Sequence, residues 1–110
     1  MKLVLLWTTG QQGTIREMLI PYTLNSKLQN WWDDVTLIIW GSSTEYLKSH
    51  QEDLDFVKKA VEIGINVEAC KACSDNYGMS ELLEECGVDV RYMGQPLTDY
   101  LQSDVKVMTI

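Results

Sequence analysis

The 110-residue sequence is poor in several residue types, and each shortage argues against a class of protein. With one histidine and three cysteines, it fits neither a histidine-rich metal site nor a densely disulfide-bonded secreted scaffold. No apolar run approaches the ~20 residues of a membrane span, and residues 3–7 are too few for a signal-peptide core. The chain has nine Lys and Arg residues and sixteen Asp and Glu residues. The resulting net charge of -7 disfavours nucleic acid and anionic membranes as partners.

The remaining composition is that of a globular protein. Hydrophobic residues make up 45% and charged residues 23% of a chain as long as one ordinary domain. No linker, repeat or low-complexity segment interrupts it, so we predict one domain over residues 1–110. Three cysteines cannot all pair within one chain, which favours reduced thiols and a cytoplasmic location.

Short apolar runs alternate with amphipathic segments along the chain. Because strands separated by helices pair in parallel, the pattern predicts a three-layer α/β/α sandwich around a five-stranded parallel sheet. Capping-box patterns that begin at Thr14, Ser42 and Ser49 predict helix starts, and Pro21 predicts a kinked or shortened first helix. Gly64 is expected to end a helix in the left-handed conformation. The predicted strands are residues 3–7, 35–40, 65–70, 88–92 and 105–110.

Functional groups in such sheets gather at the carboxyl ends of the strands. Of the loops expected there, only the one after the third strand contains a nucleophile, Cys70, with Cys73 about one helical turn later. The start of the next helix, and the neighbouring Lys71, would favour the thiolate of Cys70. Cys86 falls on the apolar stripe of a predicted helix and is expected to be buried and inert.

The Cys70-Lys-Ala-Cys73 spacing admits four interpretations. The two thiols can simply pack at a strand–helix junction, or form a dithiol–disulfide redox pair. They can contribute half of a zinc site, whose other ligands would have to be Cys86 and His50. A true site of this kind normally shows a second paired motif, so we predict no metal and no cofactor. In the fourth interpretation, an exposed thiolate accepts sulfur and passes it on as a persulfide.

Other polar and aromatic groups have simpler explanations. The Gly10–Gly13 segment lacks the ending of a phosphate-binding loop and is typical of a tight strand–helix turn. Ser42 would cap a helix, although a small anion could bind if backbone N–H groups converge there. Trp31 and Trp32 are adjacent and cannot both face the core, so one is expected to cover a partner surface.

Almost the whole chain resembles the DsrE/DsrF-like superfamily of small sulfur-relay proteins. The resemblance rests on Ile38-Ile39-Trp40-Gly41 and on the segment that runs from Gly64 through Cys70 and Cys73 to Gly78. It implies a cytoplasmic location, assembly into homo- or hetero-oligomers, and a role for Cys70 as the residue that bears the sulfur and exchanges it with donor and acceptor proteins. We predict a homo-oligomer, a dimer or trimer. Cys73 is an addition to the pattern of the better-known members.

Two functions from different classes therefore stay open. The first is a sulfur carrier that uses Cys70, with Cys73 resolving the persulfide into a disulfide. The second is a non-catalytic binding or assembly module whose cysteines only pack.

Overall fold

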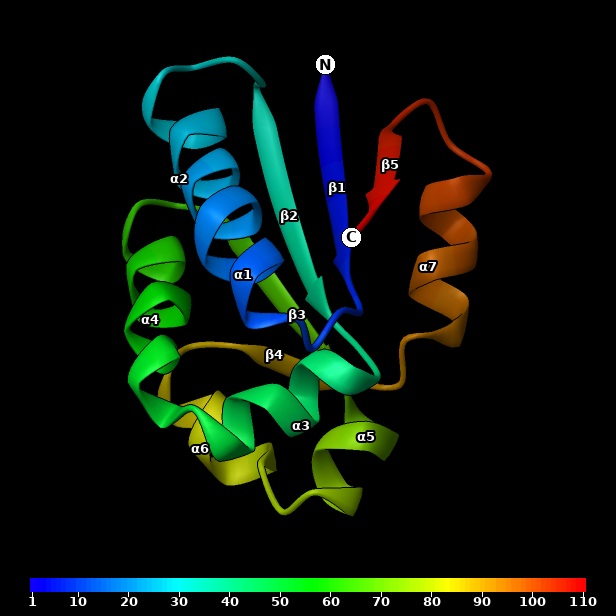
Figure 1. The fold of residues 1–110 in the computed structure, drawn as a ribbon. Helices are drawn as coiled ribbons and strands as arrows, with labels where there is room; N and C mark the ends of the chain where they lie inside the picture. Colours follow the sequence, from blue (N-terminus) through cyan, green and yellow to red (C-terminus); the bar gives the residue numbers. More distant parts are fainter.

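A computed structural model describes residues 1–110, the whole sequence given. Its five strands form one parallel sheet in the order β4-β3-β2-β1-β5 (Figure 1). The strands are β1 (Lys2–Trp7), β2 (Asp34–Ile39), β3 (Asn66–Cys70), β4 (Asp89–Arg91) and β5 (Lys106–Thr109). The helical segments are α1 (Gln12–Thr14), η1 (Ile15–Leu19), α2 (Ile20–Leu28), α3 (Ser42–Ser49), η2 (Gln51–Asp53), α4 (Leu54–Glu62), α5 (Lys71–Asn76), α6 (Ser80–Glu85) and α7 (Gly94–Leu101).

The predicted three-layer parallel sandwich is confirmed. Helices α2 and α4 cover one face of the sheet and α7 covers the other, while α3, α5 and α6 lie at the end where the strands finish (Figure 1). All five predicted strands are present, and Gly64 does take the left-handed conformation, with φ +96°. No helix is long and apolar enough to cross a membrane.

The two faces of the sheet have cores of different size. The larger core contains 21 buried residues, among them Trp7, Leu37 and Leu83. The smaller contains four buried residues, Val4, Ile38, Cys70 and Met93, with α7 packed over it. Because side chains alternate along a strand, Cys70 and its neighbour Ala69 belong to opposite faces.

The helix starts are not formed as the sequence pattern predicts. None of the three expected capping boxes makes a side-chain cap. Thr14 already lies inside a helix, Gly41, not a serine, precedes α3, and Ser49 is the last residue of α3. Pro21 does not stop its helix either. The π-helical segment η1 runs directly into α2, so Pro21 lies inside one continuous helical stretch, and the departure from α-helical geometry falls at η1, immediately before the segment that contains the proline.

Ser43 shows why the pattern at α3 is misleading. Its buried hydroxyl donates to the carbonyl of Trp7, at 2.7 Å, and accepts from the backbone N–H of Trp40, at 3.0 Å. The side chain therefore joins the ends of β1 and β2 instead of capping a helix.

Candidate functional site

The cysteine pair lies at the carboxyl end of β3, where the chain turns into α5. Cys70 is the last residue of the strand and has extended backbone angles, while Cys73 lies in the first turn of the helix. The Ser74 hydroxyl donates to the carbonyl oxygen of Cys70 at 2.8 Å and ties this turn together. The two thiols are close neighbours and both are free.

The two thiols differ in their access to solvent. Cys70 is only 4% exposed and belongs to the small core with Met93, whereas Cys73 is half-buried at the edge of that core. Met93 immediately precedes α7, so part of the core around Cys70 comes from a distant part of the chain. A reagent in solution therefore meets Cys73 first.

The expected activation of Cys70 is wrong for the protein as it stands. Burial raises the pKa of the Cys70 thiol, and the backbone N–H groups of Cys73 and Ala72, which favour the thiolate, do not outweigh it. Lys71 is committed elsewhere, because its Nζ pairs with Asp75 at 3.0 Å. The helix start at Lys71 acts as predicted, but desolvation is the larger effect.

The hypothetical zinc ligands do not meet. Cys86 is buried in the large core, on the opposite face of the sheet from Cys70, and burial raises its pKa as expected for an inert thiol. His50 follows α3 and stacks on Tyr46, with ring centroids 4.2 Å apart. No three His, Cys, Asp or Glu side chains are grouped so that they could hold a metal ion.

A buried carboxylate lies on the same face as Cys70, two residues earlier in β3. The Glu68 side chain is 1% exposed, and it accepts from the Arg91 guanidinium and, at 2.6 Å, from the Tyr100 hydroxyl. Arg91 also contacts Asp89, with 3.2 Å between its Nε and the carboxylate. Since Tyr100 belongs to α7, this cluster attaches the helix that covers Cys70 to β3 and β4.

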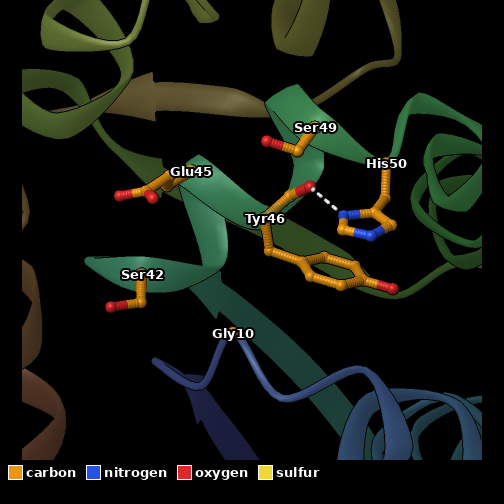
Figure 2. A pocket seen from close by; sticks show the side chains of 6 residues that line it. All are labelled: Gly10, Ser42, Glu45, Tyr46, Ser49 and His50. Carbon is orange, nitrogen blue, oxygen red and sulfur yellow. Dashed lines mark hydrogen bonds between the residues drawn. The ribbon is translucent and has the colours of Figure 1, made fainter.

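A second cluster of polar residues lies beside α3, and the sequence pattern did not predict that these residues would come together. Gly10, Glu45, Ser49 and His50 are among the residues that line an open cavity of about 190 Å³. Figure 2 shows these residues. Tyr77, one helical turn after Cys73, donates its hydroxyl to Glu45 at 2.9 Å and so connects this cavity to α5.

Comparison with known proteins places the chain in a family. No protein-family model matches it, and no curated protein sequence does. The solved structure of BT1422, a conserved protein of unknown function from Bacteroides thetaiotaomicron, is 38% identical with a TM-score of 0.94, and the match covers 99% of this chain and 94% of that one. The chain belongs to the BT1422 family.

A second solved structure is similar to this member of the BT1422 family at a lower sequence identity. The ychN protein from E. coli matches 99% of this chain and 98% of its own with a TM-score of 0.62, at 18% identity. An identity this low supports the fold alone. The parallel sandwich is the DsrE-like fold that the sequence resemblance implies.

Proposed function

We propose that this protein is a sulfur-relay protein that carries a persulfide on Cys70 and resolves it through Cys73. One observation supports this most directly: two free, neighbouring thiols lie at the carboxyl end of a strand in a DsrE-like sheet. The carboxyl ends of parallel strands are where α/β proteins bind and convert their ligands.

The chemistry needs a sulfane-sulfur donor and a thiol acceptor. In loading, the Cys70 thiolate attacks the outer sulfur of a donor persulfide, a new S–S bond forms on Cys70, and the donor leaves as a thiolate. In delivery, an acceptor thiolate attacks that outer sulfur and Cys70 is released as a thiolate. In resolution, the Cys73 thiolate attacks Cys70 Sγ, hydrosulfide leaves, and a Cys70–Cys73 disulfide remains for an external dithiol to reduce.

The burial of Cys70 gives the two thiols different tasks. A persulfide on a buried atom is shielded from water and oxidants, and Cys73, at the edge of the same core, is positioned to reach it. Loading requires the side chains packed around Cys70 to move, because only 4% of Cys70 is exposed.

Mass spectrometry of protein isolated without reductant and treated with polysulfide tests the proposal. We expect a gain of ~32 Da on the peptide with Cys70, its loss in Cys70→Ser, and longer persistence of the persulfide in Cys73→Ser. Cys86→Ser is the matched control and should load normally, since Cys86 lies on the other face. Sulfur uptake by Cys70→Ser at the wild-type level would refute the assignment.

A second candidate, an oligomeric binding or assembly module with structural cysteines, is favoured by the raised pKa of Cys70 and by its apolar surroundings. In that case neither cysteine gains sulfur, and both serine variants keep the assembly state of the wild type. Trp31, 57% exposed beside Tyr22, would contribute to a homodimer or homotrimer interface. Light scattering on Trp31→Ser tests this, and a wild type that is monomeric at micromolar concentration would refute it.

A further inference from the structure

The two thiols at the end of β3 are already in contact with each other. The side chains of Cys70 and Cys73 interact directly, and neither is tied up in a disulfide. Cys70 ends the strand, Cys73 lies in the first turn of α5, and the bond from the Ser74 hydroxyl to the Cys70 carbonyl holds the turn between them. One small ion could therefore bind both sulfur atoms without a rearrangement of the backbone.

The surroundings of this pair offer no further charged ligand. No three His, Cys, Asp or Glu side chains are grouped for a metal, so zinc lacks the four donors that it usually takes. The carboxylates nearest in the sequence are engaged, since Glu68 pairs with Arg91 and Asp75 with Lys71. The small core adds apolar side chains and the thioether of Met93. Two sulfur donors in such surroundings favour a soft ion of low coordination number.

We propose that Cys70 and Cys73 together bind one Cu(I) ion. Thiolates are the protein ligands that select this ion. In binding, each thiol releases one proton and each sulfur donates an electron pair, so Cu(I) and two thiols give an anionic bis-thiolate complex and two protons. The copper stays in the +1 state, and the step needs no oxidant or reductant. This metal site does not depend on the proposed sulfur transfer.

The different burial of the two thiols gives the binding an order. Cys73 is half-buried and can take the ion from a ligand in solution, after which Cys70, 4% exposed, displaces the remaining ligand. The apolar core then keeps water from the copper. The backbone N–H groups of Ala72 and Cys73 bond to the Cys70 sulfur and stabilise the negative charge of the complex.

Copper and persulfide exclude each other, because both need the sulfur atom of Cys70. They differ in what they require of Cys73. Copper takes both thiols as ligands, whereas a persulfide can form on Cys70 alone. Cys73→Ser therefore separates the metal site from the proposed sulfur transfer, and its half-buried position makes it the variant least disruptive to the fold.

An anaerobic competition titration measures the site. The probe is tetrakis(acetonitrile)copper(I), and bicinchoninate competes for the ion and reports its share by colour. We expect one Cu(I) for each chain, with no copper-dependent change in size-exclusion chromatography. One ion for every two chains, with a copper-dependent doubling of mass, would overturn the proposal, because it would show that Cys73 residues of two molecules share the ion.

Three variants identify the ligands. Cys70→Ser and Cys73→Ser should each lower the Cu(I) affinity by more than about 100-fold, because groups that only orient a ligand already contribute about 10–100-fold. Cys86→Ser is the control, since Cys86 is also a buried cysteine but lies on the opposite face of the sheet. Wild-type affinity in Cys73→Ser, or an equal loss in Cys86→Ser, would refute the site.

The pH and a second metal test the nature of the ligands. Because burial raises the pKa of the Cys70 thiol, this group must lose a proton when copper binds at neutral pH. Affinity should therefore increase with pH, by up to about tenfold per pH unit for each proton released. Zinc at the same concentration should not reduce copper uptake. An affinity that is independent of pH, or displacement by zinc, would contradict a bis-thiolate Cu(I) site.

The copper site and the sulfur relay can fail separately. If polysulfide loads Cys70 but Cys73→Ser binds copper as the wild type does, the copper site is wrong and the relay stands. If no persulfide forms but copper binding needs both thiols, the relay fails and the copper site stands.

Discussion

Replacing Arg91 with methionine should destabilise the protein far more than its half-exposed position indicates. The Arg91 side chain is 44% exposed, but the Glu68 carboxylate that it neutralises is 1% exposed. Removing one partner of a fully buried pair costs about 3–5 kcal/mol, because a charge is left without compensation. Tyr100 still donates to Glu68, and water can enter where Arg91 was, so we expect Arg91→Met to lose about 2–3 kcal/mol.

Arg16→Met is the matched control for this variant. Arg16 is 42% exposed and also binds two carboxylates, Glu52, which is 62% exposed, and Asp53, which is 13% exposed and also accepts from the Tyr46 hydroxyl. The Glu52 pair is a surface ion pair worth about 0–1 kcal/mol, and Asp53 is less completely buried than Glu68, so Arg16→Met should lose less than Arg91→Met. The two arginines thus differ mainly in the burial of their partners.

Urea unfolding followed by tryptophan fluorescence gives both free energies of unfolding. The double variant Arg91→Met/Glu68→Gln should recover part of the loss, because the amide carries no charge and still accepts from Tyr100. Equal losses in Arg91→Met and Arg16→Met, or no recovery in the double variant, would refute the idea that a buried carboxylate holds α7 in place.

Four further outcomes follow from the structure. Burial, together with the hydrogen bond to Glu68, raises the pKa of Tyr100 to about 12, above its ordinary value near 10. Stability due to this tyrosine is therefore present below pH 10 and lost between about pH 10 and 12, and Tyr100→Phe should show a shallower loss in urea unfolding across that range. Because burial raises the pKa of Cys70, its iodoacetamide labelling should keep accelerating above the pH at which an ordinary thiol levels off, as peptide mapping would show. Gly87→Ala should lose about 1–3 kcal/mol, since φ is +92° and a Cβ would lie 2.8 Å from Val61 Cγ1. Gly13→Ala, with nothing within 4 Å of the new Cβ, should instead gain about 0.5–1 kcal/mol in the same unfolding assay.

The strands of the sheet could be predicted from the sequence because each one corresponds to a short local pattern of residues. A strand covered on both faces is a short apolar run, and residues 3–7 and 35–40 are runs of this kind. The strand order could not be predicted in this way, since the pairing of β1 with β5 joins residues about 100 positions apart. No local pattern specifies that pairing.

The cysteine turn could be located, but its chemical state could not. Its position at the end of β3 follows from the strand boundary, whereas the small core that buries Cys70 is built from distant parts of the chain, such as Val4 and Met93. The cluster of Glu68, Arg91 and Tyr100 is equally non-local. A glutamate inside a predicted buried strand was the one available signal for it.

The capping boxes failed for a related physical reason. A serine hydroxyl satisfies whichever backbone groups the tertiary structure brings to it, and for Ser43 these are the ends of two strands. The sequence pattern is compatible with a helix cap, but the Ser43 hydroxyl instead donates to the carbonyl of Trp7, 36 positions away.

The place of β5 beside β1 has a consequence for how the chain folds. Leu3 pairs with Lys106 and Leu6 with Thr109, so one edge of the apolar strand β1 stays open until the last strand arrives. An open apolar edge is a template for another strand, and α7 and β5 form a terminal unit that a second molecule can supply in an identical position. We therefore expect refolding at high protein concentration to give domain-swapped dimers, in which each chain completes the other's sheet.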